Sequence, residues 1–217
     1  MGGQNQKYKL VLFDMDGTLI NGRSIFIFSE KLGFKDKLLT TLQSNKQPYE
    51  RSIEIARYLK GIRGDELLDI FRTIPLSDHV EKVTQKLKEQ KLTTAIVTDS
   101  YQFIADDLKK RLNFEYAFAN TLLIKNNIVS GEIQLNNDEL RSCETGITYS
   151  ICKENILDHL CTTLNIAPSE VIAIGDGLVD IGMIQKAGLG IAYHASEQVQ
   201  HHADVITNDL STILEYL

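Results

Sequence analysis

The chain has no excess of positive charge and no long apolar run. It carries 23 lysine and arginine residues against 29 aspartate and glutamate residues, a formal net charge of −6. Nucleic acids and anionic membrane surfaces are bound by basic faces, so this balance argues against both as partners. No stretch approaches the ~20 consecutive apolar residues that a membrane-spanning helix needs. These absences predict a cytoplasmic protein with no nucleic-acid and no membrane partner.

Cysteine is also scarce. The three cysteines, Cys143, Cys152 and Cys161, are odd in number and have neither CxxC spacing nor a histidine at ligand spacing. We therefore expect reduced thiols, with neither a disulfide framework nor a zinc centre. Internal repeats and low-complexity segments are missing as well. A chain of 217 residues fits one domain, or one domain with an insertion.

Short apolar, β-branched runs alternate with segments of helical periodicity. Strands are predicted from Leu10 and over 93–98, 121–125, 128–134, 171–174 and 189–193, with Asn126-Asn127 as a hairpin turn. Helices are predicted over 78–90, 102–112 and 153–164, around Met183, and from Leu210. Alternating elements with fully apolar strands are typical of an α/β fold, a parallel sheet with helices on both faces. Residues 22–78, between the first two strands, predict three or four short helices.

Polar side chains stand where three of the predicted strands end. The first strand runs into Asp14 and Asp16, followed by Gly17, which allows a sharp turn. Thr98 and Asp99 end the second strand, and Asp176 and Asp180 follow the strand over 171–174. Ligands bind at the carboxyl ends of parallel strands, so these groups predict a site. Lys153, near a helix start, is the cation that we add; Lys125 is a competitor but falls in the predicted hairpin.

Carboxylates that share a site repel one another, and a hard divalent cation such as Mg²⁺ allows them to stay ionised together. A carboxylate in that setting can attack phosphorus and form an aspartyl-phosphate. A second carboxylate can protonate the leaving oxygen and later activate water. The Thr98 hydroxyl and neighbouring amides can donate hydrogen bonds to phosphate oxygens.

Four stretches together resemble the motifs of the haloacid dehalogenase-like (HAD) phosphohydrolases, in order. The stretches are Asp14-Met15-Asp16-Gly17-Thr18, Thr98, Lys153 and 175–180, whose sequence GDGLVD matches the family's GDGxxD. Within the family the chain is most similar to phosphoserine phosphatases, through 119–131 and 187–192. The resemblance covers residues 8–20 and 79–217. It implies a Rossmann-like core of residues 1–20 and 79–217, and a helical cap of residues 21–78.

The resemblance also implies roles for single residues. Asp14 would be the nucleophile and Asp16 the general acid and base. Mg²⁺ would be bound by the Asp14 side chain, the Asp16 backbone carbonyl and Asp176. Thr98 and Lys153 would hold the phosphate, with Asp99 beside it. Asp180, Gly17 and Gly177 would support the site.

Three departures from phosphoserine phosphatases concern substrate choice. Arg23 stands where these enzymes carry a glutamate that binds the substrate's ammonium group, and a cation there suits a carboxylate or a second phosphate. Asp99-Ser100 replaces two glycines, and Val179 replaces the usual asparagine. The sequence thus predicts a Mg²⁺-dependent phosphomonoester hydrolase acting on a small phosphorylated metabolite, with phosphoserine-like compounds first. A sugar-phosphate phosphatase, a phosphotransferase to an alcohol and a low-activity phosphate-binding module stay open.

Overall fold

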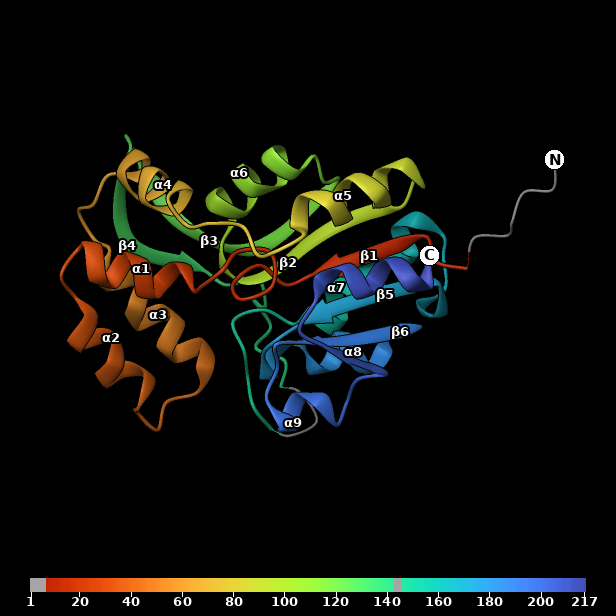
Figure 1. Ribbon diagram of the computed structural model, residues 1–217. Helices are drawn as coiled ribbons and strands as arrows, with labels where there is room; N and C mark the ends of the chain where they lie inside the picture. The colour runs from red at the N-terminus through yellow and green to blue at the C-terminus, as the bar shows by residue number, and fades with distance from the viewer. Residues whose placement is uncertain (1–6, 143–145) are drawn as a thin grey trace.

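The sheet is built around β1 (Leu10–Phe13), which pairs in parallel with β2 on one side and β5 on the other. The computed structural model describes residues 7–142 and 146–217, and within them the sheet has the strand order β4-β3-β2-β1-β5-β6-β7 (Figure 1). Every pairing is parallel except that of β3 with β4. The other strands are β2 (Thr93–Tyr101), β3 (Tyr116–Lys125), β4 (Ile128–Gln134), β5 (Val171–Gly175), β6 (Leu189–Tyr193) and β7 (Val205–Thr207).

Helices cover both faces of the sheet because its central strands are apolar on both sides. In β1, Val11 and Phe13 pack in one hydrophobic cluster, whereas Leu10 and Leu12 pack in the other. The first cluster takes in α5 (Val80–Glu89), α6 (Gln102–Leu112) and the 3₁₀ helix η3 (Leu210–Tyr216). The second takes in α7 (Lys153–Leu164) and α8 (Ile181–Lys186). The expected α/β fold with a mainly parallel sheet is confirmed. Shorter helices η1 (Pro168–Glu170), η2 (Leu178–Asp180) and α9 (Glu197–Gln200) join these elements.

Four helices follow β1 and form a group beyond the carboxyl ends of the strands (Figure 1, red to orange). Their buried residues Phe28, Leu38 and Leu67 belong to the same cluster as Met15 and Leu19 just after β1. The predicted helical insertion after the first strand is therefore present. The helices are α1 (Ser24–Lys31), α2 (Lys35–Leu42), α3 (Pro48–Tyr58) and α4 (Gly64–Arg72).

The linker between α3 and α4 lies against β4. The Gly61 amide donates to the Val129 carbonyl, and the Val129 amide donates to the Ile62 carbonyl, both at 2.9 Å. Gly131, with φ of +87°, approaches Lys60 so closely that a Cβ atom there would lie 2.9 Å from the Lys60 Cβ. The insertion is thus hydrogen-bonded to the antiparallel hairpin as well as packed on the core.

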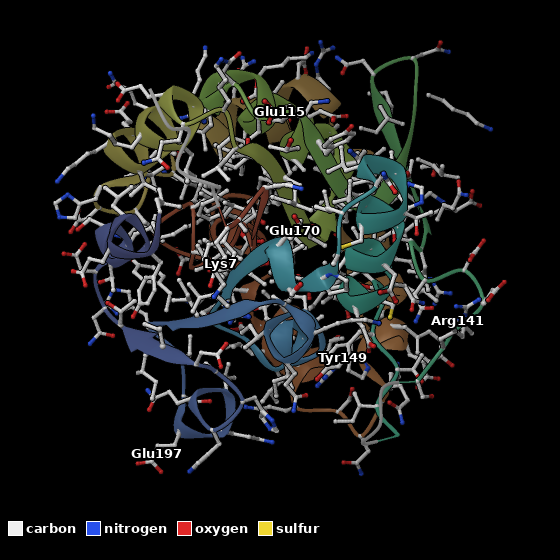
Figure 2. The ribbon with its side chains drawn as sticks, turned by 90° about the vertical axis from the view of Figure 1, so that its right-hand side faces the viewer. Lys7, Glu115, Arg141, Tyr149, Glu170 and Glu197 are labelled. Carbon is white, nitrogen blue, oxygen red and sulfur yellow. The ribbon has the colours of Figure 1, made fainter. Side chains whose placement is uncertain are left out.

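Figure 2 shows the other end of the sheet, where Lys7 and Glu170 lie just before β1 and β5. Here the Lys9 amide donates to the Glu170 carbonyl at 2.8 Å. The carboxyl ends of the strands, with the predicted site, therefore face away from this end. Among the described residues no helix has the length and apolar character needed to cross a membrane.

Several elements differ in extent from the sequence-based expectation. β2 continues to Tyr101 instead of ending at Thr98, because Tyr101 still pairs with Asn120 after an irregularity in register. β3 begins at Tyr116, before the start of the strand predicted over 121–125, and the last helix is a 3₁₀ helix. Cys152 and Cys161 are free thiols, as expected, whereas Cys143 lies outside the described residues.

Candidate active site

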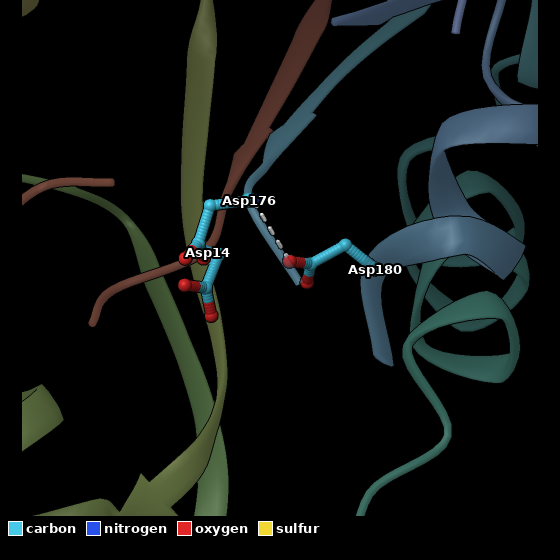
Figure 3. Close-up of side chains that lie close together, drawn as sticks. All are labelled: Asp14, Asp176 and Asp180. Carbon is cyan, nitrogen blue, oxygen red and sulfur yellow. Dashed lines mark hydrogen bonds between the residues drawn. The ribbon is translucent and has the colours of Figure 1, made fainter. Parts of the chain in front are cut away.

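Three aspartates meet at the carboxyl ends of β1 and β5. Asp14 directly follows β1, Asp176 directly follows β5, and Asp180 ends η2. Each offers a carboxylate oxygen, and the three oxygens lie within 4.8 Å of one another. Figure 3 shows the carboxylates of Asp14 and Asp176 beside each other, with the Asp176 amide donating to Asp180 Oδ2 at 3.1 Å. Strands that are adjacent and parallel end at the same edge, which brings these acids together.

Lys153 connects two of the three aspartates. Its Nζ donates to Asp14 Oδ1 and to Asp180 Oδ1, both at 2.5 Å. The Lys153 side chain and the Asp180 side chain are fully buried, and Asp14 is nearly so. A buried charge is stable only when it is paired, so each member of this triad depends on the other two. The predicted cation is therefore in place at the start of α7.

Burial controls the electrostatics of the cluster. It raises the pKa of Asp14 well above its usual value, against the opposing effect of the Lys153 ammonium, and the negative charges of Asp180 and Asp176 add to the rise. Burial also raises the pKa of Asp176, with Asp180 adding to it and Arg23 opposing. Burial opposes the charged form of Lys153, but Asp14 and Asp180 outweigh it and raise the Lys153 pKa. Carboxylates that resist ionisation together are a suitable donor set for a divalent cation.

Gly17 allows the chain to turn close to these acids, and Gly177 contributes its backbone amide to the cluster. Gly17 has φ of +90°, and a Cβ atom there would lie 2.7 Å from Asp176 Oδ2. Any side chain would therefore both strain the turn and push Asp176 out of the cluster. The Gly177 amide donates to Asp180 Oδ2 at 2.8 Å. With the Asp176 amide it engages the Asp180 oxygen that Lys153 leaves free.

Asp16, the predicted general acid and base, is held by the first residue of α1. The Ser24 amide donates to Asp16 Oδ1 at 2.6 Å, and the Ser24 hydroxyl donates to Asp16 Oδ2 at 3.0 Å. Burial raises the pKa of Asp16 to about 6, although the hydrogen bonds from Ser24 oppose the rise. A carboxyl group with this pKa exists in both protonation states near neutral pH, as a proton donor and acceptor requires.

The second predicted motif is split between the interior and the cavity. Thr98 is fully buried, and its Oγ1 accepts from the Ser100 amide at 3.2 Å. Asp99 and Ser100 line the cavity over the cluster, whereas Thr98 is not among its lining residues. The role of Thr98 in holding phosphate stays a prediction.

Arg23 lies at the edge of the cluster. Its Nη2 is 3.2 Å from Asp176 Oδ2, and its side chain is 56% exposed, so it faces the cavity as well. Burial opposes its charge, but Asp176, Asp99 and Asp14 together raise the Arg23 pKa. Sequence reasoning expected a substrate contact here and missed the ion pair with a predicted metal ligand.

The cavity between the strand ends and the helical insertion has a volume of about 930 Å³. The strand ends supply its charged floor, and α1 and α3 supply much of the opposite wall. That wall is mixed: Phe26 and Ile55 are apolar, whereas Arg51 is cationic and donates to the Leu42 carbonyl at 2.9 Å. Tyr149, labelled in Figure 2, also lines the cavity.

Some residues of the cavity were not identified from the sequence. Ser24 and His194 belong to a helix start and a strand end that no recognised motif marks. For His194 a signal existed, because it follows β6 as Asp176 follows β5, although its φ of +49° could not be foreseen. For Ser24 no signal existed, because its position depends on how the insertion folds back over the strands.

Comparison with known proteins agrees with this geometry. The family model of haloacid dehalogenase-like hydrolases matches residues 8–188. A phosphoserine phosphatase of Archaeoglobus fulgidus is 31% identical over 204 residues, which are 92% of this chain and 56% of that protein. The chain thus spans about half the length of that relative. A phosphoserine phosphatase of Methanocaldococcus jannaschii is 28% identical over 218 residues, covering 98% of this chain and 99% of that protein.

A solved structure described as a phospho-aspartyl intermediate analogue of phosphoserine phosphatase superimposes with a TM-score of 0.83 at 26% identity. The superposition covers 97% of this chain and 99% of that chain. A substrate-bound phosphoserine phosphatase complex gives a TM-score of 0.83 at 25% identity, covering 98% of this chain and 100% of that chain. Family, fold and the acidic cluster therefore agree. The chain belongs to the haloacid dehalogenase-like hydrolases, as a phosphatase of the phosphoserine phosphatase-like branch.

Proposed function

We propose that the chain is a Mg²⁺-dependent phosphomonoester hydrolase that works through an aspartyl-phosphate on Asp14. One observation carries the proposal: Lys153 bridges Asp14 and Asp180 in a buried triad, next to Asp176, at the ends of β1 and β5. The relative described as a phospho-aspartyl intermediate analogue supports the covalent step. Such a triad can orient one carboxylate and offset the charge of a bound phosphate.

The acidic cluster fits a hard divalent cation, because three carboxylate oxygens lie within 4.8 Å and all are hard donors. The Asp14 and Asp176 side chains and the Asp16 backbone carbonyl would hold Mg²⁺. Asp180 is less suited as a ligand, since Lys153 and the Asp176 and Gly177 amides occupy its oxygens. The bound ion would supply positive charge to the non-bridging phosphate oxygens.

The proposed reaction has two steps. In the first, Asp14 attacks phosphorus through Oδ2, because Lys153 holds Oδ1, and the bond from phosphorus to the ester oxygen breaks. Asp16 gives its proton to that leaving oxygen. In the second, Asp16 takes a proton from water, which attacks the aspartyl-phosphate and releases inorganic phosphate and the free Asp14 carboxylate. Lys153, with Thr98 and the amides beside Asp99, would hold the phosphate throughout.

For substrate we propose a small phosphorylated metabolite, with phosphoserine-like compounds first, on the strength of the named relatives. Arg23 favours a second candidate, a phosphate ester with a carboxylate or a second phosphate. Its guanidinium borders the cavity beside Asp176, and Arg51 adds a cation in the opposite wall. A sugar phosphate, which has neither group, is the third candidate.

We also propose that residues 21–78 act as a cap domain over a core of residues 1–20 and 79–217. The cavity lies between α1, α3 and the strand ends, so the cap would exclude water from the aspartyl-phosphate and supply substrate contacts. Ser24 and Arg51 are cap residues under this division.

Phosphate release from phosphoserine, phosphoglycerates and sugar phosphates, with Mg²⁺ and with chelator, tests the proposal. We expect Mg²⁺-dependent turnover that falls at least ~10³-fold in Asp14→Asn, because the nucleophile is lost. Asp36→Asn, an exposed aspartate in α2, is the matched control and should keep the wild-type rate. An unchanged rate in Asp14→Asn would overturn the proposal.

Two other outcomes have distinct signatures. Transfer of the phosphoryl group to added glycerol, with little free phosphate, would identify a phosphotransferase. Folded protein that binds Mg²⁺ but releases no phosphate from any ester would identify a phosphate-binding module.

A further inference from the structure

Asp16 is fixed by both of its carboxylate oxygens to one residue, Ser24. The amide of Ser24 donates to Oδ1 and its hydroxyl donates to Oδ2. Each carboxylate oxygen has a second lone pair, so these bonds fix the plane of the group without consuming the lone pairs that face the cavity. Ser24 is only 1% exposed, so water does not compete for these bonds.

The hydroxyl of Ser24 is itself oriented by a second serine. Ser24 Oγ lies 3.0 Å from Ser100 Oγ, and Ser100 lines the cavity. A hydroxyl carries one proton, and a carboxylate can only accept. Because the Ser24 proton goes to ionised Asp16, Ser100 must donate to Ser24. Hydrogen bonds are therefore donated in one direction, from Ser100 to Ser24 and from Ser24 to Asp16. The three residues come from different elements: the end of β2, the start of α1 and the turn after β1.

The two bonds from Ser24 serve different purposes. The backbone bond lets Asp16 cap the amino end of α1, and it remains whatever the side chain at position 24. The bond from the Ser24 hydroxyl is not needed to cap the helix, because the Ser24 amide already bonds to Asp16. It instead restrains the rotation of the Asp16 carboxyl group. Proton transfer to a leaving oxygen depends steeply on such orientation.

We infer that Ser24 is a positioning residue for proton transfer by Asp16, acting through its hydroxyl group. The inference rests on the proposed role of Asp16 as general acid and base. It makes the first residue of α1, whose hydroxyl hydrogen-bonds to Asp16 and Ser100, part of the proton-transfer machinery.

The quality of the leaving group tests this role. An alkyl phosphate such as β-glycerophosphate needs a proton on its leaving oxygen, whereas p-nitrophenyl phosphate releases a stable anion and needs none. The value of kcat/KM reports the steps up to departure of the leaving group, so it isolates the first proton transfer. For Ser24→Ala we expect a fall of about 10- to 100-fold with the alkyl ester and of less than about threefold with the aryl ester.

Ser29→Ala is the matched control. Ser29 is also buried and lies in the same helix, but its hydroxyl donates to the Phe26 carbonyl at 2.7 Å, away from Asp16. Both esters should be hydrolysed by this variant at the wild-type rate. Ser24→Thr keeps a hydroxyl group and should restore the wild-type ratio of the two kcat/KM values. If Ser24→Ala does not fold, Ser24→Cys replaces it, since a thiol is nearly isosteric and a weak donor.

Equal losses on the two esters, or no loss on either, would overturn the inference. Asp16→Asn separates this failure from failure of the proposed function. If Asp16→Asn selectively loses the alkyl ester while Ser24→Ala does not, only the role of Ser24 is wrong. If Asp16→Asn shows no such selectivity, the acid and base assignment is wrong as well.

Discussion

Two lysines in this protein are each held between two carboxylates, and their surroundings differ. Lys153 bridges Asp14 and Asp180 at 2.5 Å, with its side chain fully buried. Lys186, at the end of α8, bridges Glu154 at 2.9 Å and Asp158 at 2.6 Å, with its side chain 30% exposed. Both clusters lie along α7. One lysine and two carboxylates thus form a surface network in one place, and in the other they form the buried cluster of the proposed active site.

The difference teaches that position relative to the strand ends, and not charge pattern, defines the site. On the surface, water solvates each charge whether or not the pair forms, so the pairing adds little. In the buried cluster little solvent compensates a broken pair, so the charges depend on one another, and burial raises the pKa of Asp14. Asp158 and Glu154 are carboxylates paired with a lysine, as in the buried cluster, but burial does not hold them in one arrangement.

Removing each lysine should show the largest contrast. We expect Lys153→Met to lower the free energy of unfolding by about 3–5 kcal/mol, because it leaves Asp14 and Asp180 buried without their cation. Its phosphatase activity should fall at least ~10³-fold. Lys186→Met should cost less than about 1 kcal/mol and leave activity intact. Urea unfolding measures the stability of the two variants, and phosphate release measures their activity. Similar losses of stability and activity in the two variants would contradict the comparison.

The second effect should be stabilisation of the folded protein by Mg²⁺, which should depend on the buried cluster and not on the surface cluster. A cation that binds only the folded state stabilises it, by about 2.7 kcal/mol at 100 times its Kd. We expect Mg²⁺ to raise the melting temperature of the wild type and of Asp158→Asn, but not that of Asp176→Asn, which lacks one carboxylate of the buried cluster. Thermal unfolding with Mg²⁺ and with chelator gives the answer. An undiminished rise in Asp176→Asn would remove this residue from the proposed ligands.

A third effect concerns pH. The folded-state pKa of Asp16, about 6, lies above the usual unfolded value of about 3.9. The folded state therefore binds the proton more tightly, and ionisation of Asp16 costs stability as pH rises through 6. The two pKa values differ by about two units, and each unit is worth about 1.4 kcal/mol, so we expect Asp16→Asn to raise the free energy of unfolding by about 3 kcal/mol at pH 7.5.

The gain from Asp16→Asn should fade towards pH 4, where Asp16 is protonated in the folded state and about half protonated in the unfolded state. Chemical unfolding of the metal-free wild type and Asp16→Asn at the two pH values measures the gain. A gain in Asp16→Asn that does not change between pH 4 and pH 7.5 would argue against the raised pKa.

Much of the site was predictable because it depends on local sequence and on one rule of sheet topology. Asp14 and Asp176 each follow an apolar run, and parallel neighbours end at one edge, so their meeting follows from the pattern. Lys153 could be placed once the helix after it was recognised. The strand that contains Thr98 was harder, because its register shifts before Tyr101, and the fully buried Thr98 leaves Asp99 and Ser100 to line the cavity.

The sequence could not supply the contacts between the helical insertion and the strand ends. Ser24 and Asp16 are only eight residues apart, yet their bonds depend on the turn at Gly17 and on where α1 begins. Arg23 was expected in the cavity by counting from the first motif, but its ion pair with Asp176 joins residues 153 positions apart. No periodicity encodes such contacts, because they arise only when the helical insertion packs against the strand ends.

The pairing of the α3–α4 linker with β4 has a consequence for solubility. β4 ends one side of the sheet, and an uncovered outer strand offers free amides and carbonyls to another chain. Here Gly61 and Ile62 bond to Val129 along that outer side. The opposite outer strand, β7, is only three residues long. The insertion thus covers the edge of the sheet at β4, and the edge at β7 is short. The sheet therefore exposes few free backbone groups with which another chain could pair and aggregate.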